Sequence, residues 1–95
     1  MEDRLQNVRN WAKQGNLKQF QAELEMRLGP LGYRAELDMD RIRCYRITIE
    51  KGLMGIRKRE VKQAVGIIRR QNGSIEVMDA DDAFVEALTS VAPAN

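Results

Sequence analysis

Apolar residues recur at intervals of three and four over residues 2–28, which is the spacing of an amphipathic helix. Gly15 divides this pattern in two, and Asn16 followed three positions later by Gln19 is typical of a capping box at the start of the second helix. The Gly-Pro pair after residue 28 ends the pattern, because glycine suits a helix C-terminus and proline cannot continue the hydrogen-bond ladder. We therefore predict a helical hairpin over residues 2–28.

Apolar and charged residues alternate over residues 33–50, which predicts the two strands of a β-hairpin. If the turn lies at residues 39–40, Glu36 stands opposite Arg43, and the apolar residues of both strands fall on one face. The alternation changes phase near Cys44, and we expect a β-bulge there to absorb the change.

The following segment predicts a third helix, a strand and a last helix. Apolar residues from Val61 to Ile68 follow the i, i+3, i+4, i+7 spacing of a basic helix, which we place over residues 56–71. An Asn-Gly pair ends that helix and a short strand follows over residues 74–78. Acidic residues and then apolar residues at helical spacing predict a C-terminal helix over residues 80–91.

The predicted order of elements is therefore α-α-β-β-α-β-α. A chain of 95 residues has room for one hydrophobic core, so we expect residues 1–95 to form a single compact domain. A β-hairpin joined by a third strand that returns after a helix predicts a three-stranded sheet covered by helices. The expected fold class is α+β, in two layers.

Several kinds of chemistry are missing from the composition. The chain has no histidine, the commonest general base and zinc ligand, and its one cysteine, Cys44, cannot form an internal disulfide. Asp79, Asp81 and Asp82 lack the glycine and the distal glutamate of a calcium loop, and they suit the start of a helix instead. We therefore expect no metal, no other cofactor and no enzymatic activity.

No apolar run is long enough to cross a membrane. The N-terminal residues Glu2 and Asp3 are acidic, where a secretory signal would be basic. We therefore expect no membrane partner and a cytoplasmic location.

Charge is distributed unevenly, although the net charge is only +2. Residues 34–70 carry eleven basic and five acidic side chains, whereas residues 71–95 carry five acidic and no basic ones. Such asymmetry is typical of proteins that select partners electrostatically, or of two regions that meet within the fold.

The basic residues of the predicted helix gather along one flank, which is suited to a phosphate backbone or to a protein surface. Arginines of the predicted hairpin extend this flank, and apolar residues of the loop before the helix offer adaptable contacts. The candidate binding residues are Lys58, Arg59, Lys62, Arg69, Arg70, Arg43, Arg46, Leu53 and Met54.

The loop sequence Gly52-Leu53-Met54-Gly55 resembles the G-x-x-G loop with which KH domains hold a nucleic-acid backbone. In KH domains this loop joins two helices, whereas a strand is predicted to precede it here. We therefore interpret the segment as a strand-to-helix connection.

These patterns favour a small non-enzymatic binding or regulatory protein, such as an adaptor, that contacts a protein partner through the basic helix and its apolar loop. The alternative is a nucleic-acid-binding protein that places helix residues 57–70 and the hairpin arginines on phosphates, with Tyr45 as a stacking surface. The first helix, which carries Trp11, either covers the sheet or docks a partner or a second copy of this chain. A homo-oligomer is therefore one of the alternatives.

Overall fold

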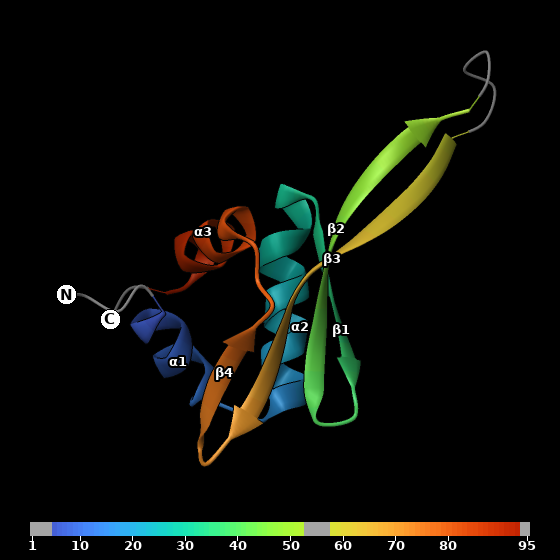
Figure 1. The fold of residues 1–95 in the computed structure, drawn as a ribbon. Helices are drawn as coiled ribbons and strands as arrows, with labels where there is room; N and C mark the ends of the chain where they lie inside the picture. Colours follow the sequence, from blue (N-terminus) through green and yellow to red (C-terminus); the bar gives the residue numbers. More distant parts are fainter. Residues whose placement is uncertain (1–4, 53–57, 94–95) are drawn as a thin grey trace.

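The computed structural model describes residues 5–52 and 58–93. These residues form an α+β fold, as expected, with a four-stranded antiparallel sheet (Figure 1). The elements in chain order are α1 (Gln6–Ala12), α2 (Leu17–Leu28), the short 3-10 helix η1 (Gly29–Leu31), β1 (Tyr33–Asp38), β2 (Arg41–Lys51), β3 (Lys58–Gln71), β4 (Ser74–Met78) and α3 (Asp82–Val91).

The capping box predicted for the second helix is confirmed. The Asn16 side chain accepts a hydrogen bond from the backbone N–H of Gln19 at 2.8 Å, and the Gln19 side chain accepts one from the Asn16 N–H at 3.0 Å. Two N–H groups that the first turn of a helix leaves without partners are thereby satisfied.

The predicted β1–β2 register is also confirmed. Glu36 pairs with Arg43, and Met39 occupies the turn with φ 58. The expected bulge lies where the register of β2 with β3 shifts between Cys44 and Tyr45, and Val65 of β3 is the extra residue. Because the extra residue lies in β3, β2 keeps its regular alternation, and its apolar residues change from the face that packs on the core (Ile42, Cys44) to the opposite face (Tyr45, Ile47, Ile49).

The helix predicted over residues 56–71 is wrong, because residues 58–71 form strand β3. The sheet consequently has four strands in the order β1-β2-β3-β4, and the predicted three-stranded sheet and the α-α-β-β-α-β-α order are wrong in this detail.

The reason for this error is the bulge. Val65 and Ile68 are three positions apart and are both buried, which is helical spacing. In a strand, residues three apart fall on opposite faces unless a bulge shifts the alternation, as it does here because Val65 is itself the extra residue. The bulge at Val65 thus gives a strand the apolar spacing of a helix.

The three helices cover one face of the sheet (Figure 1). Buried residues of β2 and β3, such as Ile42 and Ile68, pack there against Leu24 of α2 and Phe84 of α3. Trp11 of α1 is 2% exposed and meets Phe20 edge to face, with ring centroids 4.9 Å apart. The first helix therefore covers the core. No helix in the described ranges is long and apolar enough to span a membrane.

The β2–β3 pair extends beyond the rest of the molecule, as Figure 1 shows. The pairing of β1 with β2 ends at Arg46, and that of β4 with β3 begins only at Ile67. We call residues 47–51 and 58–64, which lie beyond these limits, the arm. The described residues have extents of 50 × 30 × 21 Å, and the arm lies along the longest of them.

Gly66 of β3 lies against the ring of Phe84, a residue of α3. A Cβ atom at this position would lie 3.0 Å from two ring carbons of Phe84, a side chain that is 0% exposed and has no room to move. Gly66→Val should therefore lower the free energy of unfolding by about 1–3 kcal/mol, the usual cost of overpacking a core. Ala64→Val, on the same strand but exposed, should change it by less than about 0.5 kcal/mol. Chemical denaturation of both variants tests this, and equal losses would contradict it.

Candidate binding surface

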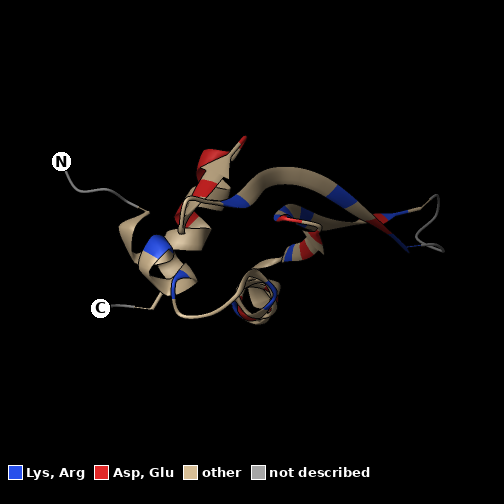
Figure 2. Ribbon diagram, turned by 90° about the horizontal axis from the view of Figure 1, so that it is seen from below, with Lys and Arg blue, Asp and Glu red and all other residues tan. Residues whose placement is uncertain are grey.

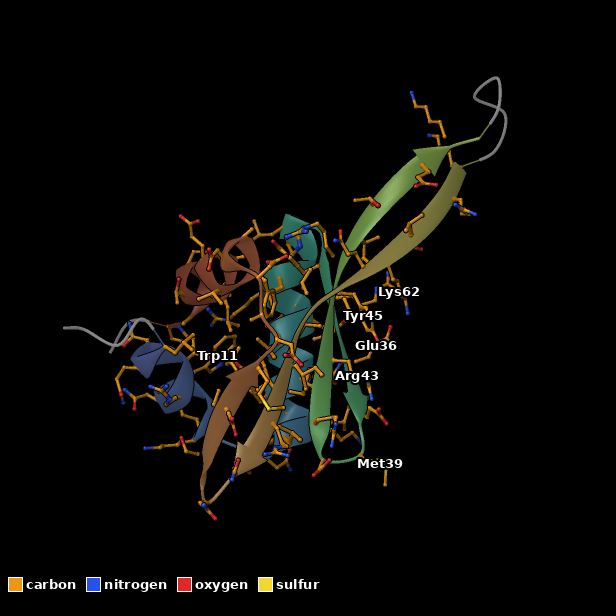
Figure 3. All side chains as sticks on the ribbon, viewed as in Figure 1. Trp11, Glu36, Met39, Arg43, Tyr45 and Lys62 are labelled. Carbon is orange, nitrogen blue, oxygen red and sulfur yellow. The ribbon has the colours of Figure 1, made fainter. Side chains whose placement is uncertain are left out.

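No element of residues 5–52 and 58–93 covers the sheet face that lies opposite the helices. We call this face the open face. Strand alternation places on it every second residue of β2, among them Arg43, Tyr45 and Ile47. In Figure 3, Glu36, Arg43, Tyr45 and Lys62 lie together on this part of the sheet. The candidate surface is thus assembled from the middle of β1, β2 and β3.

An apolar stripe made of Tyr45, Ile47 and Ile49 runs along β2 on the open face. The three residues are two positions apart, so their side chains point the same way. Ile49 is 67% exposed, and Tyr45 and Ile47 are partly buried. The stripe leads from the body of the sheet onto the arm.

Two ion pairs cross β2 and flank the stripe. Arg34 of β1 bonds Glu60 of β3 at 3.2 Å, and Glu36 of β1 pairs with Lys62 of β3. The Lys62 ammonium also lies 5.3 Å from the centre of the Tyr45 ring, a cation–π contact. These contacts fix the rim of the stripe and tie the outer strand β1 to the arm.

Most other predicted binding cations also contact acidic side chains. The Arg43 guanidinium bonds Asp38 at 2.7 Å, which raises the pKa of the arginine. Arg59 bonds Glu50 at 2.8 Å, and Arg69 lies 3.6 Å from Glu76. Basic and acidic residues accordingly alternate on the sheet and arm (Figure 2). The predicted basic flank is therefore a mixed-charge surface.

Two predicted binding residues make contacts within the fold. Arg46 bonds Asp81, the N-cap residue of α3, at 3.1 Å and lies over the Tyr33 ring. Arg70 donates hydrogen bonds at 3.0 Å to the backbone carbonyls of Ala12 and Gly15, beside the end of α1. Each arginine therefore links the sheet to a helical segment.

Lys58, like Arg70, pairs with no carboxylate in the described part of the chain, and it stands opposite Lys51 near the end of the arm. Leu53 and Met54 lie outside the described residues. The residues proposed from the sequence are thus divided among ion pairs, fold-stabilising contacts and the end of the arm.

Sequence reasoning missed the apolar stripe and the acidic residues that flank it. The alternation of Tyr45, Ile47 and Ile49 is visible in the sequence, but it fits a buried face as well as an exposed one. Glu36 and Glu60 were not candidates, because their pairing with β3 and β1 depends on a strand that was predicted as a helix. Which face of β2 is covered depends on the helices, and the local pattern carries no signal for it.

The environment of Cys44 does not favour a nucleophilic thiol. Cys44 is buried, and burial raises the pKa of its thiol to about 12, so the nucleophilic thiolate is scarce near neutral pH. Cys44 also lines a cavity of about 170 Å³ at the bulge, below the roughly 300 Å³ at which small-molecule sites begin. Among the described residues, no three His, Cys, Asp or Glu side chains are placed to share a metal ion.

Comparison with models of known protein families, with curated proteins and with solved structures found no match. The chemistry of the open face and the arm is therefore the basis for assigning a function.

Asp81 has two roles, and two different substitutions distinguish them. Its side chain accepts a hydrogen bond from the Phe84 N–H at 2.7 Å, which caps α3, and it pairs with Arg46. Asp81→Ala should lower the free energy of unfolding by about 0.5–2 kcal/mol, because the cap is lost. Asp81→Asn keeps an oxygen for the cap and loses only the partly exposed ion pair, so it should cost no more than about 1 kcal/mol. Thermal or chemical unfolding measures both, and a larger loss in the asparagine variant would contradict these roles.

Proposed function

We propose that this chain is a small non-enzymatic protein that binds a protein partner on the open face of its sheet. The observation that carries the proposal is the apolar stripe of Tyr45, Ile47 and Ile49, in which Ile49 is 67% exposed, with the Arg34–Glu60 and Glu36–Lys62 ion pairs beside it. Protein interfaces commonly combine an aromatic and aliphatic centre with a polar rim. The stripe is the centre, and Arg34, Glu36, Glu60 and Lys62 form the rim.

Whether the lysines and arginines are free or already paired with carboxylates indicates whether the partner is a nucleic acid or a protein. A nucleic-acid surface gains affinity when free lysines and arginines displace counterions from phosphates. Arg43, Arg59, Lys62 and Arg69 have a carboxylate within 4 Å, so their charge is already offset within the chain. A partner with an apolar centre and its own mixed charges suits this surface better than a polyanion.

The nucleic-acid alternative rests on the end of the arm, where Lys51 and Lys58 face each other across the strands. A two-stranded ribbon fits the major groove of DNA, and some proteins bind DNA with one. This alternative requires a strong salt dependence, which separates it from the main proposal.

Ile49→Asp should weaken binding of the protein partner at least about tenfold, or about 1.4 kcal/mol. Ile49 is 67% exposed, so the change should leave the fold intact. Met26 of α2 is 66% exposed and lies on the helical side, which makes Met26→Asp the matched control. After a partner is identified, isothermal titration of both variants against the purified partner measures the effect. Equal affinities for the two variants would place the binding site elsewhere.

Anisotropy of labelled single- and double-stranded nucleic acids, titrated with the protein at low and at moderate salt, separates the two partner classes. We expect no binding of micromolar or tighter affinity, because the open-face cations are held in ion pairs. Tight binding that falls steeply with salt, and that is lost in a Lys51→Glu/Lys58→Glu variant, would replace a protein with a nucleic acid as the partner.

A further inference from the structure

The outer edge of β3 is unpaired along the arm. β3 has β2 on one side throughout, but β4 pairs with its other side only from Ile67 onward. Next to that point, the Val65 carbonyl accepts a hydrogen bond from the Asp81 N–H at 3.0 Å. From Lys58 to Ala64, no strand of the described ranges covers this edge. Such an edge is a template for another strand.

The outer edge of β1, at the other side of the sheet, is protected by side chains. At β1 the backbone N–H of Ala35 donates to the Glu25 side chain at 2.6 Å, and the Ala35 carbonyl accepts from the Gln21 side chain at 2.7 Å. Side chains of α2 thus occupy the backbone groups of that edge and block strand addition. The free edge of β3 has no equivalent protection among the described residues.

The sequence of this edge is complementary to itself. If two copies pair in antiparallel fashion about a twofold axis at Val61, Val61 of one copy stands opposite Val61 of the other. In the same register, Glu60 stands opposite Lys62 and Lys62 opposite Glu60. Opposite charges facing each other across two strands stabilise the pairing, and so do apolar side chains in contact.

The charges around this register extend the complementarity. Within one chain, Arg34 pairs with Glu60, and Glu36 pairs with Lys62. Pairing of two copies would join these into alternating rows that run from Arg34 and Glu60 of one chain to Lys62 and Glu36 of the other. Positive and negative groups alternate along each row, so association places no like charges directly opposite each other.

The same register brings Lys58 toward the side of the other copy on which Asp79 lies. Lys58, which lacks a carboxylate partner among the described residues, would stand opposite Ala64 of the other copy. Ala64 and Asp79 line the same cavity, and the Asp79 carboxylate forms no ion pair in the described part of the chain. This lysine of one copy and this aspartate of the other are thereby brought to the same end of the joined strands.

We propose that two copies of this chain associate through the free edges of their β3 arms, with Val61 on the twofold axis. The two sheets then form one continuous sheet with both open faces on the same side, because the axis is perpendicular to the strands and to the sheet. This association uses the edge of β3 and leaves the apolar stripes exposed. It therefore goes beyond the proposed function and does not rest on it.

Charge reversal with mixing tests the register. Glu60→Lys places a second lysine against Lys62 of the other copy, and Lys62→Glu places a second glutamate against Glu60. Each variant alone should therefore dimerise at least about tenfold more weakly than the wild type, as measured by sedimentation velocity. Mixed together, the two variants make only opposite-charge pairs between the two chains, so their mixture should recover the dimer. Lys18→Glu on α2, an exposed charge reversal far from the edge, should dimerise like the wild type.

A cysteine pair tests the position of the axis. Opposite residues of antiparallel strands have Cα atoms about 4.5–5.5 Å apart, within the range of a disulfide. Val61→Cys should therefore form a disulfide-linked dimer on mild oxidation. The two copies of Gln63→Cys would be about 13 Å apart along the strands and should stay unlinked. Cys44 is buried and does not interfere.

The proposal is supported by a wild-type dimer, loss of association in each charge variant and recovery in the mixture. A wild type that stays monomeric at millimolar concentration overturns it and leaves the edge to a strand of another protein. A dimer that survives both charge reversals, a mixture that stays monomeric, or equal crosslinking at positions 61 and 63 also overturns it.

Discussion

The backbone pairing of β2 with β3 continues past the point where every neighbouring element ends. β2 has 11 residues and β3 has 14, whereas β1 has 6 and β4 has 5. The excess length leaves the body as a two-stranded arm, and an isolated two-stranded hairpin is only marginally stable in water. The ion pairs Arg34–Glu60 and Glu36–Lys62 offset this weakness, because they fasten the arm to β1. The uncovered stripe and the free edge are both consequences of the same excess length.

The bulge at Val65 divides this long pair into two parts with different environments. On the body side, Gly66 of β3 allows the ring of Phe84, a residue of α3, to approach the strand. On the arm side, the residues of β3 are mostly exposed and charged. A bulge increases the local twist of a strand, which is consistent with the way the arm turns out of the sheet in Figure 1. The position of one extra residue thus separates a structural segment from a segment available for contacts.

Local signals in the sequence predicted local structure well. The Asn16–Gln19 capping box and the Glu36–Arg43 register depend on residues close together in the chain, and both are confirmed. The state of β3 depends on a distant partner. Its apolar residues fit a helix as well as a bulged strand. The strand is selected by pairing with β2, which extends beyond the end of β1. The candidate basic residues were identified from the sequence. Their carboxylate partners lie on neighbouring strands and were therefore missed.

Amide hydrogen exchange of the arm at increasing protein concentration tests most directly whether the free edge of β3 is a binding edge. The account predicts that the amides of β3 directed away from β2, between Lys58 and Ala64, become more protected as concentration rises. The Ala35 amide, already bonded to Glu25 at 2.6 Å, should exchange at the same rate throughout. Arm amides whose exchange does not depend on concentration would contradict the account, since the edge would then remain open to water in every copy.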